Sequence, residues 1–211
     1  MFDHLLNGVL VALISYVLGA IPTAYVIARL KKVNIFEVGS GNMGATNVSR
    51  ALGMSWGIVV WVLDMAKGIV AILIARQILS DVPATAAALA AIVCIVGHNW
   101  SIFAAMLTGK LRGGKGASIW FGTLIIIAPG VLLGISLIGS LILLVTRYVS
   151  LAVLVMFAVA TLWIFVLVSQ HAMPQEYTYY SVLVSALIVY RFRENIERLL
   201  RGTERRLGER I

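Results

Sequence analysis

The sequence has few charged residues and almost no cysteine. Of its 211 residues, 12% are charged and 61% are hydrophobic, whereas soluble domains have about 25% and about 45–50%. This composition excludes a soluble globular chain. The single cysteine, Cys94, excludes an intrachain disulfide and any metal site built from several cysteines. Asp3 and His4 stand where a signal peptide carries basic residues, so the first apolar run is expected to stay as a membrane span.

Acidic residues are scarcer still, with 9 Asp and Glu against 17 Lys and Arg. In a membrane protein such an excess of basic residues marks the cytoplasmic loops. No nucleic-acid partner is expected, because no basic patch alternates with exposed aromatic residues. Asp64 is the only acid inside a predicted span, which argues against a metal-dependent phosphotransferase with its clustered carboxylates.

The apolar windows predict an all-α integral membrane protein with seven transmembrane helices, forming one polytopic domain over residues 1–211. Pro129 and Gly130 predict a turn that divides the window from 117 to 145 into two short helices. A charged, amphipathic tail follows from 191 to 211. The other predicted spans are Leu5–Ala28, Ala51–Leu79, Ala84–Met106, Val149–Val168 and Tyr177–Tyr190.

The distribution of Lys and Arg predicts the orientation. Apart from Lys67 inside a span and Arg76, which can snorkel from the outer end of the same span, these residues lie in segments 29–50, 108–116, 146–150 and 191–211. The rule that cytoplasmic loops retain positive charge puts these segments inside, the N-terminus outside and the C-terminus in the cytoplasm. A six-span alternative would leave Arg147 or the tail outside. An active site formed by cytoplasmic loops is therefore expected.

The first cytoplasmic loop contains the run GSGNMGATNVSR, from Gly39 to Arg50. Glycines let the backbone approach a ligand closely, and amide donors followed by a helix start form an anion site. A helix that begins near Gly44 puts Thr46, Asn47 and Arg50 on one face, where they offer a hydroxyl, an amide and a guanidinium to a phosphate. A solvated connector is the alternative, and the density of polar residues disfavours it.

The second cytoplasmic loop contains Arg-Gly-Gly-Lys-Gly at 112–116. The stretch from Gly109 to Lys115 nearly matches the nucleotide-binding pattern G-x-x-x-x-G-K-[ST]. However, Gly116 replaces the magnesium-binding hydroxyl residue and no strand precedes the loop. An ATP-hydrolysing loop is therefore not expected. A second anion-binding loop and a simple basic membrane anchor are both compatible with the sequence.

Charged residues within a span and in the tail form two further features. Asp64 and Lys67 lie three residues apart and can pair, either as a structural ion pair or beside a water-filled cavity. The segment from Arg193 to Glu204 has an apolar stripe suited to the membrane surface, and Asn195 beside it is expected to face inward. His98 is expected to be a packing residue.

Taken together, these segments resemble the bacterial membrane glycerol-3-phosphate acyltransferases that use acyl phosphate, the PlsY family. GSGNMGATNVSR, LDMAKG, GGKG, RYVSL and RENIERLLRGTE occur in family order and cover nearly the whole chain. The resemblance implies transfer of a fatty acyl group from acyl phosphate to the sn-1 hydroxyl of glycerol 3-phosphate. The products are lysophosphatidic acid and phosphate, in the first step of phospholipid synthesis. It also implies a multi-pass protein of the bacterial inner (plasma) membrane surrounded by membrane lipid, no cofactor, and an upstream acyl-phosphate-forming enzyme.

The resemblance also implies a set of site residues. The catalytic residues are Ser40, Arg50, Lys115 and Asn195. The residues that bind substrate phosphate are Gly41, Asn42, Gly44, Thr46, Asn47, Gly113, Gly114 and Ser150. Metal ligands are not expected. The chain departs from the family at Phe192, where a histidine is usual, at Ser101, where a proline is common, and in a longer segment between 98 and 113.

The chemistry accounts for this residue inventory. Phosphate is a stable leaving anion, so strong acid catalysis is unnecessary, and the protein must mainly hold two anionic substrates together and align the hydroxyl. In the family a substrate phosphate oxygen is thought to take the proton. That agrees with the absence of H-x-x-x-x-D near the basic loops. A non-catalytic membrane transporter or lipid-binding protein for phosphorylated substrates is the alternative, but a transporter usually shows internal repeats and polar groups along a path.

Overall fold

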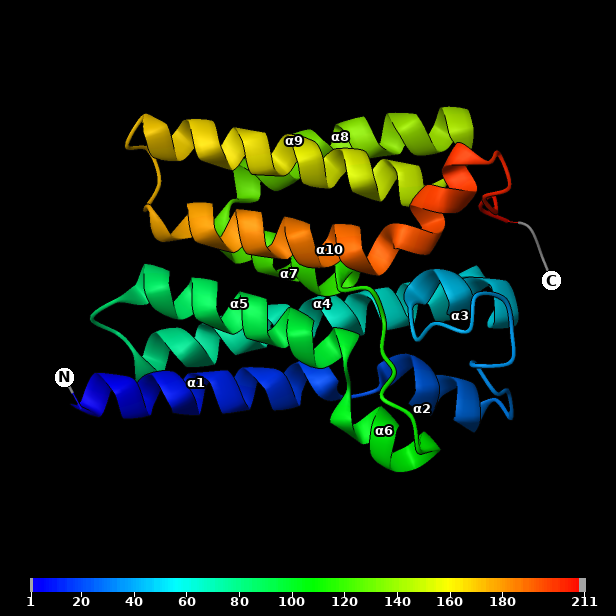
Figure 1. Ribbon diagram of the computed structural model, residues 1–211, viewed down its shortest axis with the longest axis horizontal. Coiled ribbons are helices and arrows are strands. Elements are labelled where there is room, and N and C mark those ends of the chain that lie inside the picture. Colours follow the sequence, from blue (N-terminus) through cyan, green and yellow to red (C-terminus); the bar gives the residue numbers. More distant parts are fainter. Residues whose placement is uncertain (1, 209–211) are drawn as a thin grey trace. The chain divides into compact units, whose positions relative to one another are not determined.

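The computed structural model describes residues 2–208, and this part of the chain is helical (Figure 1). Four stretches are long and apolar enough to cross a membrane: Phe2–Leu30, Met54–Ile78, Pro129–Thr146 and Val149–Ser169. The helices are α1 (Phe2–Ala20), α2 (Thr23–Leu30), α3 (Ala45–Leu52), α4 (Met54–Ile78), α5 (Pro83–Asn99), α6 (Ile102–Thr108), α7 (Ala117–Ile127), α8 (Pro129–Thr146), α9 (Val149–Ser169) and α10 (Glu176–Leu200). The expected all-α membrane protein is confirmed at this level. The count of seven spans and their orientation stay predictions.

Prolines set several of the helix boundaries, because proline has no N–H to donate and clashes with the preceding turn. Pro129 begins α8 directly after α7, so the predicted division of the window from 117 to 145 is confirmed. Pro22 divides the first predicted span into α1 and α2. That division was not predicted, since a single proline is tolerated inside many membrane helices.

Two predicted spans have different limits in the structure. The third, Ala84–Met106, is two helices, because the side chain of Ser101 caps a new helix by accepting a hydrogen bond from the Ala104 N–H at 3.0 Å. The last span was expected to end at Tyr190, with a separate tail helix. Instead α10 continues to Leu200, because the segment from 191 to 200 holds good helix formers and no glycine or proline.

The chain forms two compact units, and the first contains α1 to α6 and the start of α7, up to Thr123. Within it α1 lies along α5, and both helices contact α4 (Figure 1). Glycines permit this close packing: a Cβ on Gly19 would overlap the backbone of Cys94, and one on Gly97 would overlap the backbone of Tyr16. Small residues serve the same purpose at helix contacts in other membrane proteins.

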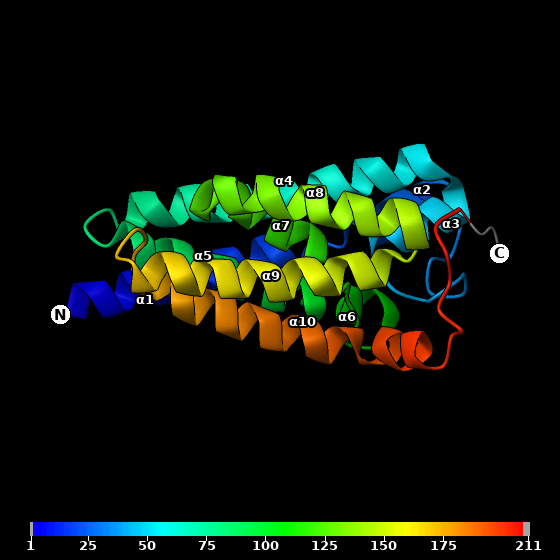
Figure 2. The same cartoon turned by 90° about the horizontal axis from the view of Figure 1, so that it is seen from above.

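The second unit begins at Leu124, and its described part ends at Gly208. In this unit α9 contacts both α8 and α10, and it lies between them in Figure 2. Gly134 leaves room for the Trp163 ring, and the hydroxyls of Thr161 and Ser185 bond α9 to α10. The prediction of one polytopic domain stays a prediction. The end of the predicted tail, residues 209–211, lies outside the described residues.

Candidate active site

The first predicted loop, between α2 and α3, is built around Asn47. As predicted, α3 begins directly after Gly44. The Asn47 side chain is buried, its Oδ1 accepts a hydrogen bond from the Ser40 N–H at 2.9 Å, and its Nδ2 donates to the carbonyls of Ile35 and Val38 at 3.1 and 3.0 Å. The amide that the sequence suggested for phosphate thus binds the loop's own backbone. Asn47 shapes the loop, and its part in phosphate binding stays a prediction.

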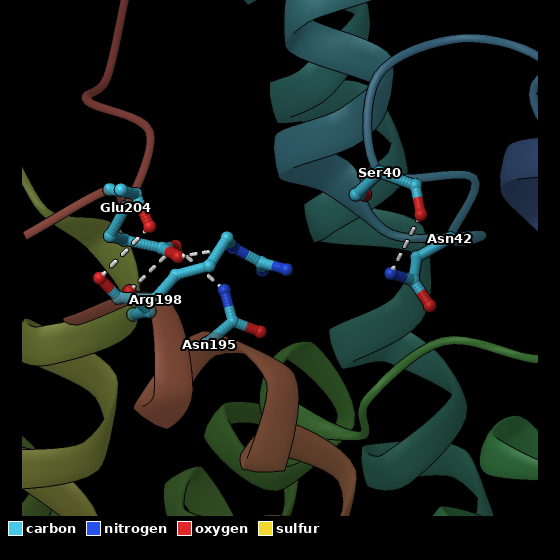
Figure 3. A network of polar contacts seen from close by, with 7 residues as sticks. Ser40, Asn42, Asn195, Arg198 and Glu204 are labelled. Atoms are coloured by element: carbon cyan, nitrogen blue, oxygen red, sulfur yellow. Dashed lines mark hydrogen bonds and ion pairs between the residues drawn. The ribbon is translucent and has the colours of Figure 1, made fainter. Parts of the chain in front are cut away.

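Glycines give this loop its path. Gly39 and Gly41 have φ angles of 63° and 65°, in the left-handed region that glycine adopts without strain. A Cβ on Gly41 would also come within 3.1 Å of the Phe36 carbonyl oxygen. Asn42 Nδ2 donates to the Ser40 carbonyl at 3.2 Å, as Figure 3 shows. Residues 40 and 42 are therefore held in a tight, half-buried turn.

The face predicted for α3 is present in part. Thr46 and Arg50 lie one helical turn apart, and both are half-buried, so their side chains can reach a ligand. Gly44 is the extended residue that precedes the helix. Asn47, on the same helix, is the member of the predicted set that is fully buried.

The second predicted loop packs against the end of α5. The Gly114 N–H donates to the His98 carbonyl, and the Ser101 N–H donates to the Arg112 carbonyl, both at 3.0 Å. A Cβ on Gly113 would overlap the carbonyl oxygens of His98 and Asn99, and a Cβ on Gly114 would overlap the His98 imidazole. These glycines are thus required by packing inside the protein. His98 is buried, as expected of a packing residue.

The first unit brings the two glycine loops together at Phe36. The guanidinium of Arg112 lies over the Phe36 ring, 4.6 Å from its centroid, a cation–π contact. Phe36 also supplies the carbonyl against which Gly41 packs. Lys115 follows three residues after Arg112 and is half-buried. Sequence reasoning missed this junction, since nothing in the spacing links a phenylalanine in one loop to an arginine in the other.

The second unit brings together two other predicted residues, Ser150 and Asn195, on a carboxylate that was not predicted as a site residue. Glu204 Oε1 accepts hydrogen bonds from Ser150 Oγ at 2.9 Å and from Asn195 Nδ2 at 2.7 Å. Its Oε2 accepts from Arg198 Nε at 2.8 Å (Figure 3). Ser150 and Asn195 are buried, so the inward orientation expected of Asn195 is confirmed.

The position of Glu204 follows from the end of α10. Gly202, with a φ of 68°, donates to the Leu199 carbonyl, and the Thr203 N–H donates to the Arg198 carbonyl. This is the Schellman motif, in which a left-handed glycine turns the chain back along its helix. The turn returns residue 204 to the side of Asn195. In the sequence, Gly202 indicated the end of the helix, and Glu204 follows it by two residues.

The electrostatics of Glu204 favour a carboxylate. Burial alone raises the pKa of this carboxyl group, because it disfavours the charged form. The hydrogen bonds from Arg198, Asn195 and Ser150 and the charge of Arg198 outweigh burial, and the resulting pKa lies below its ordinary value. The side chain of Glu204 is only 5% exposed.

Phe192, one turn before Asn195 on α10, occupies the position where the family pattern has a histidine. Its side chain is buried. Asn195 keeps its polar contact beside this apolar side chain. Residues 2–208 hold no group of three or more His, Cys, Asp or Glu side chains arranged to bind a metal ion.

Comparison with known proteins identifies the family. A family model described as "Glycerol-3-phosphate acyltransferase" matches residues 9–202. The chain belongs to the glycerol-3-phosphate acyltransferase family. A glycerol-3-phosphate acyltransferase of Halalkalibacterium halodurans is 40% identical over 206 residues, which cover 96% of this chain and 97% of the relative. One from Thermus thermophilus is 42% identical over 199 residues and 94% of each chain.

Solved acyltransferase structures agree with this assignment. Crystal structures of PlsY (YgiH), an integral membrane glycerol 3-phosphate acyltransferase, include a glycerol 3-phosphate form. It aligns with a TM-score of 0.85 and 37% identity over 95% of this chain and 96% of that chain. The lysophosphatidic acid form aligns with a TM-score of 0.82, 36% identity and 95% coverage of both chains. The predicted PlsY family and acyltransferase class are thereby confirmed, and the alternative of a non-catalytic transporter or lipid-binding protein gains no support.

Proposed function

We propose that this acyltransferase moves a fatty acyl group from acyl phosphate to the sn-1 hydroxyl of glycerol 3-phosphate in the bacterial inner membrane. The family match over residues 9–202 carries the proposal. The solved PlsY forms are named for glycerol 3-phosphate and for lysophosphatidic acid, which are the acceptor and the product of such a transfer. Because acyl phosphate is a reactive mixed anhydride, an upstream acyl-phosphate-forming enzyme supplies it.

The two glycine loops of the first unit are the proposed phosphate sites. Arg50 and Lys115 each place a positive charge in a half-buried position, where attraction to a phosphate exceeds that in open water. Ser40 and Thr46 add hydroxyl groups, and the residues around them supply backbone N–H groups. Asn47 contributes by holding the first loop in shape.

In the second unit, Ser150 and Asn195 are the proposed site residues, and both donate a hydrogen bond to Glu204. The Ser150 hydroxyl donates in this bond, and a serine hydroxyl can also accept a hydrogen bond from a ligand. Glu204 acts through these two residues and is a positioning residue.

In the proposed reaction the sn-1 hydroxyl oxygen attacks the acyl carbonyl carbon and forms a new C–O bond. The bond from that carbon to the phosphate oxygen breaks, and its electron pair leaves with phosphate. The hydroxyl proton goes to a phosphate oxygen of the substrates. The protein accelerates these steps by holding two anions close together and by keeping the hydroxyl aligned for attack.

Donor choice provides the first test. Purified protein given acyl phosphate and glycerol 3-phosphate is expected to release phosphate without added metal, whereas acyl-CoA is not expected to support turnover. The reason is that the chain lacks an H-x-x-x-x-D base motif near its basic loops, and residues 2–208 hold no group of three or more His, Cys, Asp or Glu side chains that could bind a metal ion. The measurement is phosphate release together with thin-layer detection of lysophosphatidic acid. Comparable rates with acyl-CoA, or loss of activity in chelator, would contradict the proposed donor chemistry.

We also propose seven spans with the C-terminus in the cytoplasm. Besides the four long apolar stretches, Pro83–Asn99 and Ala117–Ile127 are shorter apolar helices, and α10 supplies the seventh. The basic segments then share one side.

Cysteine labelling tests this orientation cleanly, because the native Cys94 is fully buried while Gln175 and Thr203 are exposed. In intact cells a membrane-impermeant maleimide is expected to label Gln175→Cys. The variant Thr203→Cys should react only after permeabilisation. Labelling of Thr203→Cys from outside would reverse the assignment.

A further inference from the structure

A break in the first membrane stretch is held by side chains from two other segments. Between α1 and α2, the Ile21 carbonyl accepts a hydrogen bond from Lys67 Nζ at 2.7 Å, and the Ala20 carbonyl accepts one from Ser101 Oγ. Carbonyls at a helix end lack their usual intrahelical partners, and Pro22 has no N–H to supply one. The Ile21 carbonyl also accepts from the Thr23 N–H at 3.0 Å, so Lys67 is its second donor. Inside a membrane protein such groups must be satisfied by the protein itself.

Lys67 is fixed for this task by Asp64. The two residues lie three apart on α4, and Lys67 Nζ is 2.7 Å from Asp64 Oδ1. Their side chains are 8% and 1% exposed, so the predicted pair is present and buried. A buried charge in a membrane span is expensive and usually serves a function. The ammonium group of Lys67 bridges the Asp64 carboxylate and the Ile21 carbonyl.

Ser101 links the same break to the second glycine loop. Its side chain donates to Ala20 and caps α6, while its backbone N–H donates to the Arg112 carbonyl at 3.0 Å. The neighbouring Trp100 carbonyl accepts a hydrogen bond from Tyr16 near the end of α1, at 2.8 Å. The segment 100–101 is thus bound on one side to the break and on the other to the loop that contains Lys115.

We infer that Lys67 is a positioning residue for the second glycine loop. By holding the Ile21 carbonyl it fixes the break, the break fixes Ser101, and Ser101 fixes Arg112 and the residues up to Lys115. The inference rests on the proposed function, because it assigns that loop to a substrate phosphate. Asp64 keeps Lys67 in place and is not itself needed as a charge.

Three variants separate positioning from simple stabilisation. Asp64→Asn keeps an oxygen that can accept a hydrogen bond from Lys67, and Lys67 can still donate to the Ile21 carbonyl. However, the charged Lys67 side chain loses its buried counter-charge. Asp64→Asn/Lys67→Met removes both charges and also removes the donor to Ile21. Ser101→Ala removes the hydrogen bond from the Ser101 hydroxyl to the Ala20 carbonyl. Lys32→Met, at an exposed lysine, is the matched control.

The expected activity and stability rankings are opposite. The double variant should unfold at a temperature equal to or above that of Asp64→Asn, because no lone charge is left buried. Yet its KM for glycerol 3-phosphate should rise by about tenfold or more through loop displacement, while Asp64→Asn and Lys32→Met stay within about threefold of wild type. Ser101→Ala should reproduce the rise, and adding it to the double variant should change little further, since both act through one route.

Trypsin cleavage after Arg112 and Lys115 provides a readout that needs no activity. A loosened loop should be cut about fivefold faster or more in the double variant than in wild type or Lys32→Met, at a temperature where all remain folded. Unchanged KM and unchanged cleavage in the double variant would overturn the inference. Losses of activity that rank in the same order as the losses in melting temperature would also overturn it. If the wild type failed to transfer from acyl phosphate while cleavage still ranked as expected, the proposed function would fail and the anchoring by Lys67 would stand.

Discussion

Replacement of Arg50 or Lys115 by alanine is expected to lower acyl transfer by at least about 100-fold, because loss of one preorganised charge from a partly dry site costs about 3 kcal/mol. Arg50 lies on α3, directly after the first glycine loop, and Lys115 lies in the second; both residues are half-buried. Neither substitution touches the hydrogen bonds of Asn47 or Gly114 that give the loops their shape. The loss should therefore appear in kcat/KM with the melting temperature nearly unchanged.

Two exposed basic residues are matched controls. Arg29 lies at the end of α2, and Lys110 lies in the same loop as Lys115. Arg29→Ala and Lys110→Ala remove the same charges from open solvent, where a single charge contributes little at physiological ionic strength. Their kcat/KM values should stay within about twofold of wild type. If Arg50→Ala behaved like Arg29→Ala, the first loop would not be the phosphate site.

Local features of the site were predictable from the sequence. Proline and glycine act on neighbouring residues, so the helix break at Pro129 and the start of α3 after Gly44 were predicted correctly. Asp64 and Lys67 are separated by one helical turn, and their pairing follows from that spacing. The family assignment came from short runs of residues that occur in a fixed order.

Features that depend on distant residues could not be predicted in this way. The bonds from Asn47 to Ile35 and Val38 convert an apparent ligand into a loop brace, and only the folded loop reveals them. Gly113 and Gly114 were interpreted as phosphate-binding glycines, yet their close neighbours are His98 and Asn99 of another helix. A polar pattern indicates which groups are present but not which of them are already used inside the protein.

Glu204 gives the second large expected effect. Glu204→Ala removes the acceptor for Ser150 and Asn195, and a buried donor left without a partner costs about 1–3 kcal/mol. Thermal unfolding in detergent should therefore occur at a clearly lower temperature. Transfer should also fall by about tenfold or more, since two proposed site residues lose their orientation. Glu204→Gln keeps one acceptor oxygen, so its melting temperature and its activity should fall less. Arg198, which loses its charged partner, is 30% exposed and can be hydrated instead.

The control for Glu204 is Glu197, which pairs with Arg201 at 2.6 Å while its side chain is 58% exposed. Exposed pairs contribute about 0–1 kcal/mol, so Glu197→Ala should unfold at nearly the wild-type temperature and keep its activity. Equal effects of Glu197→Ala and Glu204→Ala would show that the buried contacts of Glu204 do not hold Ser150 and Asn195.

The pH dependence of stability separates the charge of Glu204 from its shape. Its pKa in the folded protein lies below the ordinary value, so folding favours the carboxylate, and the stabilisation is complete above the ordinary pKa of about 4.5. It decreases as the pH falls below that value and is lost as the pH passes the lower pKa of the folded state. The wild-type melting temperature should therefore fall more steeply with acidification than that of Glu204→Gln, which has no proton to gain. Parallel acid profiles for the two proteins would mean that the Glu204 carboxylate is not stabilised by Arg198, Asn195 and Ser150.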